Sequence, residues 1–262
     1  MKMKVTFLGT GASLGTPVLG CTCPVCTSAD EKDKRLRSSI LIENGKETLI
    51  IDTGPDFRQQ MLSTGVSKID SFLYTHSHHD HIGGMDETRA VYYAMNKQPL
   101  QFYMEDFTEQ GIKKYYDYLF AELDSGEKYH GRPQADFHLI RPGEFFQTKK
   151  GTNILPLRIW HGNLPVTAYK IGRMLYMTDV KRIPPETLQH ITPETILILG
   201  VLHKKPHHLH LRLDEALELV EKTQPKQTYF IHISHWMGKH EEVSRSLPEN
   251  VFLSYDGLKI EI

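Results

Sequence analysis

Residues 75–84 read Thr-His-Ser-His-His-Asp-His-Ile-Gly-Gly, and the apolar residues 72–74 precede them. The apolar run predicts the end of a buried strand, and the two glycines follow the point where the chain turns. Because side chains alternate along a strand, His76 and His78 point to the same side, and Asp80 and His81 can face them after the turn. Three imidazoles and one carboxylate in one loop suit Zn, Mn or Fe. The stretch therefore predicts a metal site where a strand leaves its sheet.

The pattern His-x-His-x-Asp-His in this stretch resembles the signature of the metallo-β-lactamase superfamily. The resemblance implies an α/β fold, a four-layer αβ/βα sandwich of two mixed β-sheets flanked by helices, with one or two metal ions at its edge. We expect residues 1–262 to form a single hydrolase domain of this kind, because 262 residues suffice to bury one substantial core.

The resemblance also implies which residues complete the ligand set. A third histidine should end a later strand, and His161 follows the largely apolar residues 154–160. A bridging carboxylate and a last histidine should follow two further strands, which indicates Asp179 and His232. One divalent ion, Zn or Mn, would take His76, His78, His161 and Asp179, and a second would take Asp80, His81, Asp179 and His232. Position 78 is His and not the Glu of the diiron electron-transfer branch, which favours hydrolysis over redox chemistry.

The three cysteines of the chain, Cys21, Cys23 and Cys26, all lie within six residues. An odd number of clustered cysteines is a poor basis for disulfide pairing. The spacing Cys-x-Cys-x-x-Cys supplies three thiolates for a tetrahedral structural zinc, and His235 is our candidate for the fourth ligand. The alternative is a set of buried free thiols. Thiols that stay reduced also indicate a cytoplasmic location.

Four segments taken together are similar to PhnP-like phosphodiesterases: residues 8–12 (Leu-Gly-Thr-Gly-Ala), the cysteine cluster, the motif at 76–81, and residues 232–235 (His-Ile-Ser-His). This resemblance implies hydrolysis of small or cyclic phosphodiesters through a hydroxide shared by two metal ions. A tRNA-processing endonuclease of the same superfamily is one alternative. A non-catalytic carrier resembling PqqB is another, because residues 54–60 are similar to that family.

The leaving group of such a reaction needs a proton donor. The register of the helix expected at 213–223 against PhnP-like chains implies His210, although His207 and His208 stay open as alternatives. Asp80 would both ligate a metal and orient the attacking water. By the same resemblance, Asp52 would orient a metal-ligating histidine, while Asp56 could cap a helix expected at 57–63.

Composition narrows the class of partner. The net charge of −1 gives no general argument for nucleic-acid binding, although a basic run at 32–37 leaves it open, and a small phosphodiester is the expected substrate. No apolar run approaches the roughly 20 residues of a membrane span, and the first residues resemble a strand and not a signal peptide. The aromatic stretch at 106–123 predicts one amphipathic helix, which favours core packing over a lid or a homodimer face.

Overall fold

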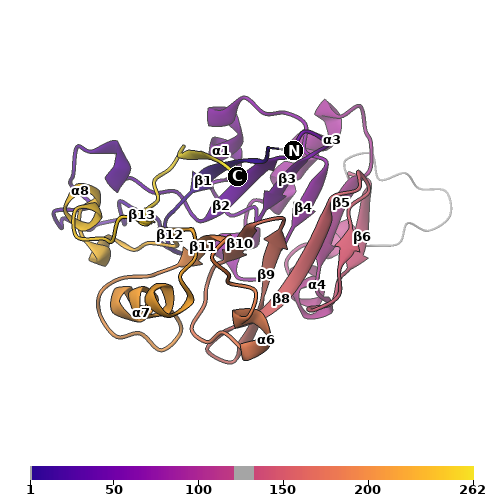
Figure 1. Cartoon of the computed structure of the whole chain (residues 1–262). Helices are drawn as coiled ribbons and strands as arrows, with labels where there is room; N and C mark the ends of the chain where they lie inside the picture. Colours follow the sequence, from indigo (N-terminus) through magenta and orange to yellow (C-terminus); the bar gives the residue numbers. More distant parts are fainter. Residues whose placement is uncertain (1, 121–132) are drawn as a thin grey trace, which may run out of the picture.

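The architecture consists of two seven-stranded β-sheets packed face to face, with helices on both outer faces (Figure 1). It was obtained as a computed structural model that describes residues 2–120 and 133–262. The first sheet has the order β14-β1-β2-β3-β4-β5-β6. Its strands are β1 (Lys4–Gly9), β2 (Ser39–Glu43), β3 (Thr48–Ile51), β4 (Ser71–Leu73), β5 (Leu100–Met104), β6 (Ala135–Leu139) and β14 (Lys259–Glu261).

The second sheet has the order β13-β12-β11-β10-β9-β8-β7. Its strands are β7 (Phe146–Gln147), β8 (Asn153–His161), β9 (Leu164–Ile171), β10 (Met174–Met177), β11 (Ile196–Gly200), β12 (Gln227–Ile231) and β13 (Val251–Leu253). Both sheets are mixed, since β3 to β6 and β10 to β13 run parallel to their neighbours while the remaining pairs are antiparallel. Strands β2 and β3 form a hairpin around Asn44 and Gly45, with Glu43 paired to Thr48.

The α-helices are α1 (Phe57–Thr64), α2 (His79–Ile82), α3 (Thr88–Ala94), α4 (Asp106–Lys113), α5 (Asp117–Phe120), α6 (Pro185–Leu188), α7 (Leu213–Thr223) and α8 (His240–Ser244). Three short 3-10 helices are η1 (Glu31–Asp33), η2 (Met85–Glu87) and η3 (His235–Met237). Among the described residues, no helix has the length and apolar composition that a membrane span requires.

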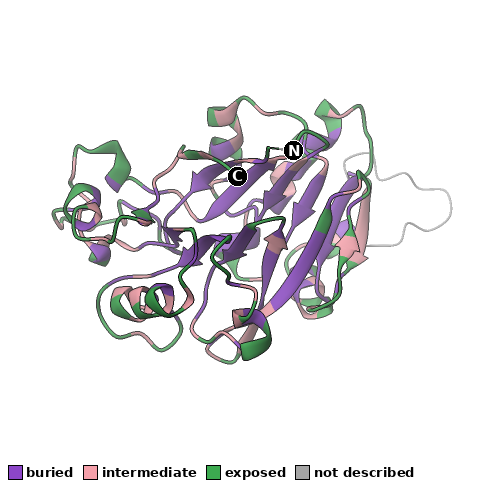
Figure 2. Ribbon diagram, viewed as in Figure 1, coloured by how far each residue is buried: buried purple, intermediate pink, exposed green. Residues whose placement is uncertain are grey.

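Alternating side chains of each strand feed different layers of the core. In β2, Ile40 and Ile42 face the second sheet and pack with Tyr176 and Ile198, whereas Leu41 faces outward and packs with Phe57 of α1. The central strands are consequently buried on both faces, whereas the edge strands β6, β7 and β14 and the outer sides of the helices are partly exposed (Figure 2). The expected sandwich of two mixed sheets flanked by helices is confirmed.

Helix α7 follows its sequence pattern, and its expected bounds, 213–223, are confirmed. Ala216 and Val220 are buried against the outer face of the second sheet, at a spacing that places them on one side of the helix. The helix begins where the Glu215 carboxylate accepts a hydrogen bond from the Arg212 backbone N–H at 3.0 Å.

Two expectations from the sequence were wrong in detail. The single helix expected at 106–123 breaks into α4 and α5, and residues 121–123 lie outside the described part of the chain. Tyr116 lies between the two pieces, where its hydroxyl donates to the Ile82 carbonyl at 3.0 Å and its ring packs on the core. Asp56 precedes α1 but does not cap it, since its carboxylate accepts instead from the Arg37 backbone N–H at 2.7 Å and from the Arg37 guanidinium at 2.9 Å.

Candidate metal centre

Five strand ends meet at one edge of the sandwich and carry the predicted metal ligands. The motif at 76–81 follows β4, His161 ends β8, Asp179 follows β10 and His232 follows β12. Asp52 follows β3 beside them. Asp52, Asp179 and His232 have left-handed backbones, with φ of 63°, 48° and 59°, which turn each chain abruptly out of its sheet at this edge.

One group of four side chains is fully enclosed. Donor atoms of Asp80, His81, Asp179 and His232 all lie within 4.8 Å of one another, and all four residues are buried. The His81 Nε2 atom lies 3.0 Å from Asp179 Oδ2 and 3.3 Å from Asp80 Oδ2. The His232 Nε2 atom lies 3.2 Å from Asp179 Oδ1 and 3.4 Å from Asp80 Oδ2. Asp179 therefore faces His81 with one oxygen and His232 with the other.

A second group lies against the first and reaches solvent. The His76 ring is 4.6 Å from the ring of His78 and 6.2 Å from that of His161, and His78 is 5.3 Å from His161. His78 is exposed, whereas His76 and His161 are buried. Donor atoms of His161, Asp179 and His210 also lie within 4.8 Å of one another. The seven predicted ligands thus converge, with Asp179 between the two groups.

Hydrogen bonds on the far side of the rings fix their orientation. The Asp52 Oδ2 atom lies 2.7 Å from His81 Nδ1 and accepts a hydrogen bond from the Thr75 hydroxyl at 2.8 Å. That hydroxyl oxygen in turn lies 3.0 Å from His76 Nδ1. His161 Nδ1 donates to the Leu209 carbonyl at 2.8 Å. All three rings consequently direct Nε2 toward the shared centre. The role expected of Asp52 matches its position; the Leu209 carbonyl is a backbone group, so no side-chain pattern indicates it.

The donor atoms of the centre fit a bound cation. The Nε2 atom of His76 is buried and has no hydrogen-bond partner among the described residues. Unpaired buried nitrogen is costly to the fold unless another group satisfies it. Imidazole and carboxylate donors of this kind suit Zn, Mn or Fe, so a buried Asp/His cluster suited to metal binding is present.

The electrostatics of the centre also favour a bound cation. Burial would raise the pKa values of Asp179 and Asp80, but the neighbouring imidazoles of His232 and His81 outweigh it and hold both far below their usual range. Burial would lower the pKa of His81, yet Asp179 and Asp80 raise it well above its usual value. Asp179 and Asp80 therefore favour positive charge at this position, which is the charge that a divalent ion would supply.

Of the three histidines considered as proton donor, only His210 contacts the centre. Its ring lies 4.4 Å from His161 and 4.9 Å from His232, and its Nδ1 is 3.9 Å from Asp179 Oδ1. His207 lies one ring further out, 5.1 Å from His210, and His208 is exposed. Burial, opposed by the charge of Asp179, lowers the pKa of His210 to about 2, so the ring is neutral before substrate binds.

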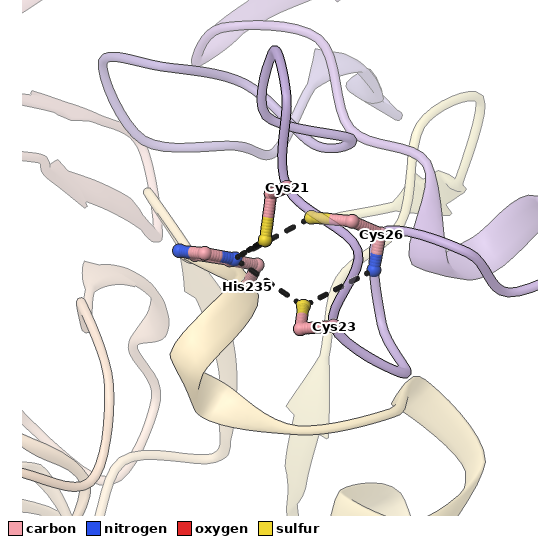
Figure 3. Close-up of side chains that lie close together, drawn as sticks. All are labelled: Cys21, Cys23, Cys26 and His235. Atoms are coloured by element: carbon pink, nitrogen blue, oxygen red, sulfur yellow. Dashed lines mark hydrogen bonds between the residues drawn. The ribbon is translucent and has the colours of Figure 1, made fainter.

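The cysteine cluster forms a separate group on the same edge. The His235 Nδ1 atom lies 3.3 Å from Cys21 Sγ, 3.4 Å from Cys23 Sγ and 3.4 Å from Cys26 Sγ (Figure 3). All four residues are half-buried, and the three cysteines are free of disulfides. This convergence fits a tetrahedral zinc, whose bonds to sulfur and nitrogen are about 2.3 and 2.0–2.1 Å. His235 follows His232 by three residues, so one strand exit serves both groups.

Comparison with known proteins agrees with this class of site. The two mixed sheets and the buried Asp/His cluster define a protein of the metallo-β-lactamase type. Residues 47–233 match the β-lactamase superfamily domain, and the chain belongs to this superfamily, whose members are in general metal-dependent hydrolases.

Two solved structures are similar to this chain over 99–100% of its length. A structure described as a new diphosphatase from the PhnP family superimposes with a TM-score of 0.91 at 36% identity, covering 100% of this chain and 98% of the other. Zinc-bound PqqB from Methylobacterium extorquens has the same fold, with a TM-score of 0.78 at 17% identity, covering 99% of this chain and 100% of the other.

Among sequence relatives, an octanoyltransferase of Porphyromonas gingivalis is 36% identical over 260 residues, which is 98% of this chain and 51% of the relative. A coenzyme PQQ synthesis protein B of Methylobacterium radiotolerans is 35% identical over 97 residues, 32% of each chain. The present chain therefore spans about half the length of the first relative and matches a third of the second.

Proposed function

We propose that this protein is a metal-dependent phosphodiesterase that acts on small or cyclic phosphodiesters. The position of Asp179 carries the proposal, because its carboxylate belongs both to the group of Asp80, His81 and His232 and to the group of His161 and His210. A carboxylate placed between two groups of imidazoles suits two ions. The likeness to a PhnP-family diphosphatase at 36% identity supports a phosphoric ester as the substrate.

The donor set divides as follows in this proposal. His76, His78, His161 and Asp179 would hold one divalent ion, and Asp80, His81, Asp179 and His232 would hold the other, with Zn or Mn as the metal. When bound, two such ions supply Lewis acidity to the phosphoryl oxygens and make a water nucleophilic at neutral pH. The exposure of His78 places the open side of the site toward solvent.

The remaining side chains supply orientation and a proton. Asp52 and Thr75 hold the rings of His81 and His76, so a substrate meets a preorganised centre. Asp80 orients the attacking water besides ligating. To protonate the leaving oxygen, His210 would first take up a proton from solvent, which the negative charge of the arriving phosphodiester favours by raising its pKa.

The cysteine cluster has a structural role in this proposal. Three thiolates and the His235 imidazole fill all four positions of a tetrahedral zinc, so no position is left for a substrate. Reduced thiolates also support a cytoplasmic location.

The octanoyltransferase similarity does not favour acyl transfer by this chain. Covalent acyl transfer uses a nucleophilic side chain at the reacting centre, such as Cys, Ser or Lys. The three cysteines of the chain gather on His235, and the Asp/His cluster contains no such nucleophile. This chain also spans only half of that relative.

A substrate panel tests the proposal. The protein, loaded with Zn or with Mn, is assayed on bis(p-nitrophenyl) phosphate, a 2′,3′-cyclic nucleotide, a precursor tRNA and an octanoyl thioester, with Asp179→Ala as the inactive control. We expect turnover of the diesters that Asp179→Ala loses. Cleavage of the tRNA alone would favour the endonuclease, and no turnover with both metals bound would favour a carrier resembling PqqB.

A further inference from the structure

Trp236 is exposed to an unusual extent for its size. The side chain is 60% exposed, although it lies in η3, directly after the zinc-site residue His235. Tryptophan has a large apolar surface and is concentrated at binding sites, where a partner covers that surface. An exposed indole beside a metal centre therefore needs either a structural or a binding explanation.

Its surroundings hold the indole in one place. The His235 ring stacks on it at 5.1 Å with 24° between the planes, and the His203 ring lies 5.6 Å away at 50°. The Trp236 backbone N–H donates to the Ser234 hydroxyl at 3.3 Å. One side of the indole is thus supported by a residue of the zinc site, while more than half of the side chain stays accessible.

A row of imidazoles joins Trp236 to the metal centre. The ring of His232 lies 4.9 Å from His210, His210 lies 5.1 Å from His207, and His207 lies 5.6 Å from His203. His203 then contacts Trp236 at 5.6 Å. The row therefore leads from the centre to the exposed indole through rings in contact.

Two lysine side chains, Lys204 and Lys205, lie at the outer end of this row of imidazoles. The Lys205 Nζ atom lies 5.8 Å from the centre of the Trp236 ring. Lys204 and Lys205 are both exposed, and neither forms an ion pair with a carboxylate of the described residues. An exposed indole with a flexible ammonium group over its ring provides the two elements of nucleotide binding, charge for phosphate and a ring for the base once the lysine side chain turns to the phosphate.

We infer that Trp236 and Lys205 form a subsite for the part of the substrate remote from the scissile bond. The base of a nucleotide stacks on Trp236, and a second phosphate group contacts Lys205 and Lys204. The substrate class is consequently a nucleoside diphosphate ester, hydrolysed with one phosphorus atom at the Asp/His cluster. This inference rests on the proposed function.

Fluorescence tests base binding without turnover. The chain has two tryptophans, so Trp160→Phe leaves Trp236 as the only indole reporter. We expect ADP and adenosine to quench the fluorescence of Trp160→Phe protein and ribose 5-phosphate to leave it unchanged. ADP should bind more tightly than adenosine, and Lys205→Gln should reduce that difference. Equal response to ribose 5-phosphate, or no response to ADP, would overturn the subsite.

Kinetics on two matched diphosphate diesters, identical except for the adenine base, provides the second test. Trp236→Ala should raise KM about 10-fold for the ester with the base, leave kcat and the base-free ester unchanged, and be rescued by Trp236→Phe. Zinc content and melting temperature should match wild type. Equal losses on both esters would assign Trp236 a structural role and overturn the inference. If the wild type cleaves neither ester but turns over the diesters of the substrate panel, the substrate class inferred here is overturned while the proposed function stands. If it cleaves none of these compounds, the proposed function fails, and the fluorescence titration still decides base binding.

Discussion

The Asp/His cluster, formed by the seven predicted metal ligands and Asp52, differs from the cysteine cluster in composition, burial and the part of the chain that supplies it. The strand exit after β12 contributes to both, because it carries His232 and His235. The Asp/His cluster draws side chains from five strand ends between Asp52 and His232, most of them buried, and one member, His78, reaches solvent. The cysteine cluster takes three ligands from six residues and a fourth from η3, all half-buried. A centre assembled by the whole fold can keep an open side for a substrate, whereas a closed local site ties two loops together.

The largest expected effect is a loss of activity when a ligand of the Asp/His cluster is removed. Asp179→Ala should reduce phosphodiester turnover to the uncatalysed level, because the side chain lies between both groups of ligands. Steady-state assays with metal content measured in parallel check this. Circular dichroism should show an intact fold. Retained turnover would remove Asp179 from the site.

His210→Ala should have an effect that depends on the leaving group. With an alkyl or nucleoside leaving group, kcat/KM should fall by about 10²–10⁴-fold, since the leaving oxygen needs a proton. With an aryl leaving group, which is stable as a phenolate, the loss should be small. The matched controls are His207→Ala and His208→Ala, whose rings lie further out. Equal losses on both substrates would instead indicate a positioning role or a metal-ligand role.

Asp52→Asn should weaken metal binding by about 10–100-fold, because the Asp52 carboxylate fixes the rings of His81 and, through Thr75, of His76. Metal titration of the chelator-treated protein measures this. Asp56→Asn is a suitable control, since that carboxylate binds Arg37 and contacts no ligand in the centre. Equal affinities in the two variants would contradict the role of Asp52.

Cys23→Ser should show the opposite profile to Asp179→Ala. The melting temperature should fall by roughly 5 °C or more and one zinc should be lost, because binding at a closed site also contributes to folding. The value of kcat per folded, metal-loaded molecule should stay near that of wild type. Unchanged zinc content and melting temperature would eliminate the structural site.

The smallest effect concerns the thiols after zinc is removed. A backbone N–H from Cys26, outweighing burial, lowers the pKa of Cys23 to about 6, while burial raises the pKa of Cys26 to about 11. At pH 7 the chelated protein should therefore be alkylated first at Cys23, which is mostly thiolate, and last at Cys26. Below pH 6 the reaction at Cys23 should slow as its thiolate is protonated. Peptide mass spectrometry after a short pulse of iodoacetamide records the order, and modification of Cys26 first would contradict it.

The sequence predicted the Asp/His cluster better than its surroundings, for physical reasons. The motif at 76–81 is marked by its residue types and by the apolar strand before it, and the family resemblance that it carries indicated the strand ends at His161, Asp179 and His232, which the structure brings to the motif. The break between α4 and α5 contains Tyr116, which bonds to an acceptor across the fold, and no local periodicity records such a contact. The pairing of Asp56 with Arg37 likewise arises from loops distant in sequence. The choice among His207, His208 and His210 required the ring distances.

The left-handed backbones of Asp52, Asp179 and His232 have a consequence for how this protein could be made more robust. Each non-glycine residue in that conformation is intrinsically unfavourable by roughly 1 kcal/mol or more. Glycine relieves this penalty at each position and removes a working side chain at the same time. At Asp52 and Asp179, however, glycine would also leave the buried partners Thr75 and His81 unsatisfied. The strained backbone at these strand exits is therefore retained for the side chain that it carries, and stability cannot be improved there without dismantling the centre.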